Sequence, residues 1–208
     1  MTGYFISLEG GEGAGKSTQA KALSVALQAK GIDVCLTREP GGTPTAEVIR
    51  DLLLSGHEEK LNIRTEALLF AAARSEHCET LIKPALKSGK WVISDRFIDS
   101  SRAYQTVSGS LSDKDIMALH HVGSGNLMPR RTFVLDLPEE FASRRAAMRD
   151  CGNSDRIGGR DSSYHRAVMA KFRQYANEEP DRVKLIDASQ SPADVTAKLL
   201  QNLTDLID

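Results

Sequence analysis

A glycine-rich run near the N-terminus constrains the fold of this chain more than any other feature. Residues 10–17 read Gly-Gly-Glu-Gly-Ala-Gly-Lys-Ser and match the pattern G-x-x-x-x-G-K-[ST]. The run follows a short, bulky apolar segment at 4–8, and after it Ala20, Leu23 and Leu27 recur at helical spacing. The sequence therefore predicts a strand, a glycine loop and a helix in direct succession.

This succession is typical of a loop that binds phosphate groups. Glycines let successive backbone N–H groups turn inward around an anion, and the N-terminus of the following helix adds partial positive charge at the same place. We expect Lys16 to reach the β- and γ-phosphates of a nucleotide and Ser17 to ligate Mg²⁺. A turn that binds nothing would need the Lys-Ser spacing to be accidental. The predicted nucleotide-binding residues are Gly10, Gly11, Glu12, Gly13, Ala14, Gly15, Lys16, Ser17 and Thr18.

Composition excludes several other classes of protein. The 208 residues carry a formal net charge of -1, so the chain has no overall positive field for holding nucleic acid or an anionic membrane. Its three cysteines form no C-x-x-C pair, which gives no sign of a disulfide framework or a zinc site. No apolar run approaches the roughly 18 residues of a membrane span, and the N-terminus lacks a signal pattern. We expect a cytoplasmic protein without nucleic-acid or membrane partners.

Alternating apolar and helical patterns predict an α/β fold. Helical patterns separate the apolar segments, and such alternation favours a parallel sheet covered on both faces, with ligands at the carboxyl ends of the strands. We expect one domain over 1–208, in which the glycine-, serine- and charge-rich stretch 149–163 is a mobile flap. The predicted strands are 3–8, 32–37, 90–94, 131–137 and 182–187.

Charged residues follow two of the predicted strands. Arg38 comes after the second strand, where it is either an anion-binding group or a solvated loop charge. Asp95 and Arg96 come after the third strand, which places a carboxylate near the expected Mg²⁺ and a second arginine beside it. Asp95 fits the role of a helix cap equally well.

The predicted helix over roughly 63–88 carries an arginine within an apolar face. Phe70 and Arg74 lie one turn apart on that face and could present a ring and a guanidinium to one ligand. Taken singly, Phe70 fits a core position and Arg74 fits an ion-paired side chain. The residues that share the face are Ile63, Ala67, Phe70, Ala71, Arg74 and Cys78.

Several motifs together resemble those of one kinase family. Segment 93–105 contains Asp-Arg-Phe-Ile-Asp-Ser-Ser-Arg-Ala-Tyr-Gln, which fits D-R-[FYH]-x-x-S-x-x-A-[FY]-Q. With the glycine loop, the Leu-Phe-Ala-Ala-Ala-Arg helix and the Val-Leu-Asp-Leu-Pro-Glu-Glu strand end, the chain resembles bacterial thymidylate kinases over essentially its whole length. The resemblance implies a P-loop nucleoside monophosphate kinase fold with a five-stranded parallel sheet in the order 2-3-1-4-5. It also implies transfer of the γ-phosphate of Mg·ATP to dTMP, giving dTDP and ADP, and usually a homodimer.

The resemblance also assigns residues to the base of dTMP. It implies that Phe70 stacks on thymine and that Ser101 and Gln105 form hydrogen bonds with its edge. Arg74 is implied to contact the base or the nearby phosphate.

A second group of residues is assigned to the sugar and the phosphate. By the same resemblance, Arg38 and Arg96 lie near the phosphate of dTMP and Glu12 lies near the 3′-hydroxyl. Tyr104 is implied to stand where a ribose 2′-hydroxyl would intrude.

The remaining catalytic charge is expected from the flap. One group of relatives carries an arginine inside the glycine loop, whereas this loop has Glu12 and Ala14, and the flap has Arg149, Arg156 and Arg160. This pattern resembles the subgroup with catalytic arginines in the lid. Family lids often continue Asp-Arg-Ile into an acidic residue, but glycines follow here, so the choice among the three arginines stays open. The expected catalytic residues are Lys16, Arg38, Asp95, Arg96 and Arg156.

Two other functions are compatible with a glycine loop of this kind. A GTPase switch would need a guanine-reading N-K-x-D stretch, and the sequence has none. Another nucleotide or deoxynucleoside kinase of the same fold stays open, because base and sugar choice depends on few residues, such as Ser101, Tyr104 and Gln105. The phosphate of dTMP is already an anion at neutral pH, so its phosphorylation would need no dedicated general base.

Overall fold

A five-stranded parallel sheet forms the centre of the computed structural model, which describes residues 3–54, 61–138, 141 and 157–207. The strand order is β2-β3-β1-β4-β5, which confirms the order implied by the family resemblance. Each strand lies on one of the five predicted segments, shifted by two residues or fewer. The strands are β1 Phe5–Gly10, β2 Val34–Arg38, β3 Trp91–Asp95, β4 Arg131–Asp136 and β5 Val183–Asp187.

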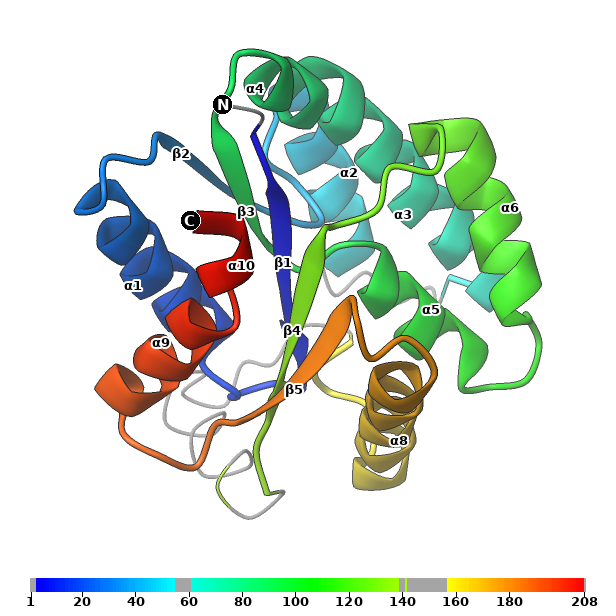
Figure 1. Ribbon diagram of the computed structural model, residues 1–208. Coiled ribbons are helices and arrows are strands. Elements are labelled where there is room, and N and C mark those ends of the chain that lie inside the picture. Colours follow the sequence, from blue (N-terminus) through cyan, green and yellow to red (C-terminus); the bar gives the residue numbers. More distant parts are fainter. Residues whose placement is uncertain (1–2, 55–60, 139–140, 142–156, 208) are drawn as a thin grey trace.

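Helices cover both faces of this sheet (Figure 1). On one side lie α1 (Lys16–Gln28), α9 (Pro192–Gln201) and the short α10 (Thr204–Ile207). Among the described residues, no helix has both the length and the apolar character needed to cross a membrane. The helices on the other side are α2 Pro44–Leu54, α3 Ile63–His77, α4 Lys83–Lys87, α5 Ile98–Thr106, α6 Asp113–Ser124 and α8 Ser162–Glu178.

The three central strands β3, β1 and β4 are buried along nearly their whole length because helices cover both faces of the sheet. All of β1 is buried, and Ile6 and Leu8 pack in the same cluster as Leu23 of α1. Phe5 belongs to the opposite cluster, where its ring meets Phe97 edge-on at 4.7 Å between centroids. Burial of each such side chain contributes about 1.5–3 kcal/mol. The packed core therefore holds the carboxyl ends of the strands in fixed positions, as a binding site requires.

The predicted helix over 63–88 is divided into three parts. After α3 ends, residues Cys78–Ile82 form a π-turn, and α4 follows directly. The N–H of Lys83 bonds to the carbonyl of Cys78, five residues back. Pro84, at the start of α4, has no N–H to continue the ordinary ladder. The proline therefore accounts for a change of helix type that the apolar periodicity alone did not reveal.

The sheet register brings three sequence segments to one edge. Arg38 of β2 and Leu8 of β1 both pair with Asp95 of β3. Just past this level, the N–H of Arg96 bonds to the carbonyl of Leu8 at 2.9 Å, and that of Glu39 bonds to the carbonyl of Asp95 at 2.9 Å. The glycine loop follows β1 at the same edge, so Arg38, Asp95 and Arg96 lie near the start of the loop.

Candidate active site

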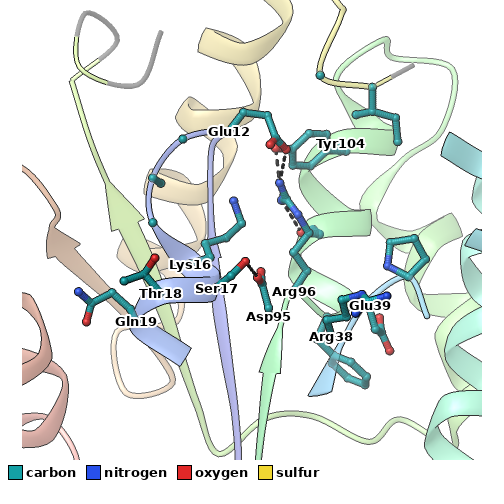
Figure 2. Close-up of a pocket in the computed structure, with 18 of the residues that line it drawn as sticks. Glu12, Lys16, Ser17, Thr18, Gln19, Arg38, Glu39, Asp95, Arg96 and Tyr104 are labelled. Carbon is teal, nitrogen blue, oxygen red and sulfur yellow. Dashed lines mark hydrogen bonds and ion pairs between the residues drawn. The ribbon is translucent and has the colours of Figure 1, made fainter. Parts of the chain in front are cut away.

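A cavity of about 740 Å³ opens at this carboxyl edge (Figure 2). The glycine loop, the ends of β2 and β3, helices α3 and α5 and residues 157–158 all contribute to its wall. Gly10 and Gly11 do not line it, and most other predicted site residues do. The predicted residues in the wall are Glu12, Gly13, Ala14, Gly15, Lys16, Ser17, Thr18, Arg38, Phe70, Arg74, Asp95, Arg96, Ser101, Tyr104 and Gln105.

Two glycines shape the loop that begins the cavity. Gly10 has φ 134°, and a Cβ there would lie 2.6 Å from the carbonyl oxygen of Leu135. Gly15 has φ 89° and is the N-cap of α1. Both conformations exclude ordinary side chains. As a result α1 begins at Lys16, and the unpaired N–H groups of its first turn lie beside the cavity, as an anion site requires.

Lys16 is the cation of the loop. It is nearly buried, and its ammonium donates a hydrogen bond to the carbonyl of Gly11 at 2.7 Å. Burial, together with the positive charge of Arg96, lowers the pKa of Lys16 from 10.5 to about 8. An anion bound in the loop would restore full protonation, because an opposite charge favours the ammonium form.

Ser17 and Asp95 meet at the metal site that the sequence predicts. The Ser17 hydroxyl donates a hydrogen bond to Asp95 Oδ2 (Figure 2). Asp95 is not a helix cap, because α5 begins at Ile98 after Phe97, which makes no side-chain cap bond. In the described part of the chain, no three or more His, Cys, Asp or Glu side chains group as metal ligands. Two hard oxygens fit Mg²⁺ if phosphate oxygens and water complete its shell.

Arg96 joins the two ends of the cavity. Its φ of 71° is unusual for a residue other than glycine. Its guanidinium donates hydrogen bonds to Glu12 of the loop, to the carbonyl of Gly10 at 3.2 Å and to the Tyr104 hydroxyl at 3.3 Å (Figure 2). The side chain thus lies between the glycine loop and α5, and brings Glu12 and Tyr104 to one side of the cavity.

Glu9 supports this turn, and the sequence analysis missed it. It is fully buried, and its carboxyl accepts hydrogen bonds from the Phe97 N–H at 2.8 Å and from the Ser100 hydroxyl at 2.6 Å. Burial, with the nearby charge of Asp99, raises the pKa of Glu9 from 4.5 to about 8. A sequence signal was present, because Glu9 is the acidic residue of an apolar strand directly before the glycine loop.

Arg74 is held firmly at the far end of the cavity. It is 3% exposed, and its guanidinium donates to Glu39 Oε2 at 2.8 Å and to the Ser101 hydroxyl at 2.9 Å. His77 Nδ1 lies 3.0 Å from the other oxygen of Glu39. Arg74 is therefore both a cavity residue and an ion-paired residue, so the two interpretations from the sequence are compatible.

Phe70 and Arg38 hold less enclosed positions. Phe70 lines the cavity and packs, partly buried, against the cluster that contains Tyr104 and Ile157. The Arg38 side chain is 55% exposed and pairs with Glu47 at 3.0 Å. Phe70 thus has both a core side and a cavity side, while Arg38 lies at the rim.

A second ion pair, formed by a buried carboxylate and a partly exposed arginine, lies beside Gln105. Gln105 Nε2 donates to Glu66 Oε1 at 3.0 Å, and Arg160 donates to Glu66 Oε2 at 2.6 Å. The structure therefore places Arg160 beside α3 and α5 and not among the lining residues. Arg149, Arg156 and the 149–156 part of the predicted flap lie outside the described residues.

Comparison with known proteins explains why these residues gather at one cavity. The sequence model of the thymidylate kinase family matches residues 8–199, which include the glycine loop, both strand-end clusters and α5. The chain belongs to the thymidylate kinase family. As a member, it is a nucleoside monophosphate kinase that phosphorylates dTMP with ATP, and neither a GTPase nor another nucleotide kinase is favoured.

Individual thymidylate kinases match over their full length. The enzyme of Rhizorhabdus wittichii is 52% identical over 207 residues, with 100% of both chains covered. That of Pseudomonas syringae pv. tomato is 47% identical, covering 100% of this chain and 98% of its own. A crystal structure of thymidylate kinase from Ehrlichia chaffeensis superposes with a TM-score of 0.78 at 30% identity, over 98% of this chain and 100% of that one.

Proposed function

We propose that this cavity holds ATP and dTMP end to end and that the γ-phosphoryl group passes between them beside Arg96. The observation that carries the proposal is that one cavity joins a phosphate loop to a buried group of hydrogen-bonding side chains. The loop end suits the triphosphate of ATP, and the end formed by Phe70, Arg74 and α5 suits a planar base. A phosphorylated nucleoside is long enough to place its phosphate between these ends.

The loop end binds the donor. The backbone N–H groups of residues 10–18 and the ammonium of Lys16 would neutralise the β- and γ-phosphates. Ser17 and Asp95 would hold Mg²⁺, which supplies positive charge to the phosphates when it is bound. Their oxygen donors suit this ion, and their contact already brings them together.

The far end binds the thymine base. Phe70 would stack on the ring, while Arg74, Ser101 and Gln105 would form hydrogen bonds with its polar edge. Arg74 and Ser101 are already bonded to each other, so their orientation is set before the nucleotide arrives. Such preorganisation lowers the entropic cost of binding.

The sugar and phosphate of dTMP would lie between the two ends. Tyr104 would exclude a 2′-hydroxyl, Glu12 would accept a hydrogen bond from the 3′-hydroxyl, and Arg38 and Arg96 would pair with the phosphate. Because both reacting groups are anions, the residues act by aligning and neutralising them, and no general base is needed. Arg156, with Arg149 as the other candidate outside the described residues, would add charge from the flap in the transition state.

An acceptor panel tests this function. ADP release with Mg·ATP would be measured for dTMP, dUMP, UMP, CMP, AMP and thymidine. We expect the highest kcat/KM with dTMP, because thymine fits the base site and the phosphate pairs with Arg38 and Arg96. Equal or better turnover of UMP or AMP would overturn the proposed acceptor site.

The same proposal includes a homodimer in the cytoplasm. Val48 and Leu52 on α2 and Leu68 on α3 are exposed, and α2 packs against α3. Two copies could bury this apolar face against each other. Light scattering would measure the mass, and Leu68→Lys should shift a dimer toward monomer. Cysteines in neither a disulfide nor a zinc pattern support the cytoplasmic location.

A further inference from the structure

A fully buried carboxylate next to the base site has no role in phosphoryl transfer. Glu66, in the first turn of α3, is 0% exposed. One of its oxygens accepts from Gln105 and the other from Arg160. An ionised carboxylate only accepts hydrogen bonds, so any amide that touches it must present its NH₂ group. Glu66 therefore decides which end of the Gln105 amide faces away from it.

The amide oxygen of Gln105, which faces away from Glu66, lacks a hydrogen-bond donor among the described residues. Gln105 is 1% exposed and lines the cavity. A buried acceptor without a donor is costly, and native structures usually supply one. The donor that fits is a ligand group at the cavity wall.

Arg160 is itself well anchored. Its guanidinium lies over the ring of Tyr164, 4.6 Å from the centroid. The Tyr164 hydroxyl in turn donates to the backbone carbonyl of Tyr104 at 2.7 Å. Tyr104 and Gln105 are neighbours on α5. The Arg160 guanidinium, through Tyr164, and the Gln105 amide are therefore both attached to this helix.

We propose that Glu66, paired with Arg160, locks the Gln105 amide with its oxygen toward the base and thereby selects a base that carries an N3–H. Thymine has this N–H between two carbonyl oxygens, whereas N3 of cytosine is an unprotonated acceptor. With the lock in place, cytosine would bring a lone pair against the lone pairs of Oε1. The inference rests on the proposed contact between Gln105 and the base.

The reversed amide explains why both partners are required. Turned by 180°, Gln105 would offer its NH₂ group to cytosine, but Oε1 would then face the carboxylate of Glu66. Two acceptors in contact repel each other, so the native lock excludes this state. A neutral amide at position 66 would bond to either end of Gln105. Loss of Arg160 would weaken the lock as well, because its hydrogen bond of 2.6 Å to Glu66 Oε2 helps to hold the carboxylate in place against Gln105.

The sharpest test compares dTMP with 5-methyl-dCMP, which differ only at N3 and C4 of the ring. We expect the ratio of the kcat/KM value for dTMP to that for 5-methyl-dCMP to fall at least about tenfold in both Glu66→Gln and Arg160→Gln. The reason is that a reversed Gln105 amide could donate a buried hydrogen bond to N3 of cytosine, where the native amide opposes it with a lone pair. The KM for ATP should stay unchanged in both. Glu178→Gln makes the same chemical change on the exposed surface of α8 and should leave the ratio as it is in the wild type.

A double-mutant cycle shows whether Glu66 acts through Gln105. Gln105→Met removes the amide, so adding Glu66→Gln should not change the ratio further. An unchanged ratio in both single variants would overturn the lock, as would an equal effect of Glu66→Gln in the Gln105→Met background. If Glu66→Gln does not fold, Arg160→Gln decides the question, because Arg160 lies partly exposed on a turn.

The outcomes also separate this inference from the function on which it rests. If Gln105→Met leaves kcat/KM for dTMP unchanged, the contact with the base is wrong and the lock fails with it. If Gln105→Met lowers that value while the Glu66 and Arg160 variants keep the native ratio, only the lock is wrong.

Discussion

The two ends of the cavity are built in different ways. The end proposed for phosphate, the phosphate end, comes from one continuous stretch, in which backbone N–H groups and Lys16 would provide the binding groups. The end proposed for the base, the base end, comes from distant parts of the chain, and its arginines are already paired within the protein: Arg74 with Glu39 and Arg160 with Glu66. A phosphate group is an anion, so a loop that offers a lysine and unpaired backbone N–H groups can bind it. A neutral base needs hydrogen-bonding groups held in fixed orientations.

The strongest test of this contrast is the buried pair at the base end. Arg74→Met should lower the free energy of unfolding by about 3 kcal/mol, because it leaves Glu39 buried without its guanidinium. Urea denaturation at pH 7 measures the change. Arg38→Met is the matched control, since its pair with Glu47 is exposed and should contribute less than about 1 kcal/mol. Equal losses in the two variants would contradict the difference in burial.

The phosphate end should respond in activity and not in stability. Lys16→Ala should lower kcat by at least about 10²-fold, because it removes a preorganised charge from the transferring phosphate. The unfolding free energy should not fall, since the ammonium is already penalised by burial. ADP release and urea denaturation are the two measurements. If a folded Lys16→Ala variant turned over nearly as fast as the wild type, the proposed role of the glycine loop in phosphoryl transfer would be wrong.

Phe70 tests whether the base end binds by stacking. Phe70→Ala should weaken dTMP binding by roughly 1–3 kcal/mol, on the scale of base–aromatic stacking. Titration calorimetry measures it, and the affinity for ATP should not change. Arg64→Ala, an exposed change on the same helix, serves as the control. An unaltered dTMP affinity would assign Phe70 to the core alone.

A pH-dependent effect is expected from Glu9, which lies between the two ends. Its pKa is raised from 4.5 to about 8, so the folded state keeps a proton that the unfolded chain has lost. The contribution of Glu9 to stability should therefore fall as the pH rises from about 5 to 8 and then level off. Glu9→Gln should remove this contribution, so the variant should gain stability relative to the wild type as the pH rises toward 8. Melting temperatures between pH 5 and 8.5 measure it, and parallel curves for both proteins would contradict the assignment.

The sequence predicts the phosphate end of the cavity better than the base end. The strand order came with the family resemblance, and the strand positions came from apolar segments. The proximity of Ser17 and Asp95 was predictable because the carboxyl ends of parallel strands meet at one edge. These features depend on local patterns and on the backbone.

The side-chain pairs of the base end could not be predicted in the same way. Glu39 with Arg74, and Glu66 with Arg160, join residues on separate elements through particular rotamers, and neither periodicity nor composition encodes them. Arg160 is one of three flap arginines among which the sequence leaves the catalytic one open. Its described contacts lie at Glu66 and Tyr164, since a buried carboxylate attracts the arginine that can reach it.

The backbone of Arg96 has a consequence for engineering. A residue with φ 71° is a standard target for replacement by glycine, because glycine relieves a strain of roughly 1–3 kcal/mol. A stability-guided redesign of this chain would therefore change Arg96 early. The change would relieve the backbone strain, but it would also remove the side chain that pairs with Glu12 and connects the glycine loop to α5. Backbone strain alone is therefore a misleading criterion for choosing variants of this kinase.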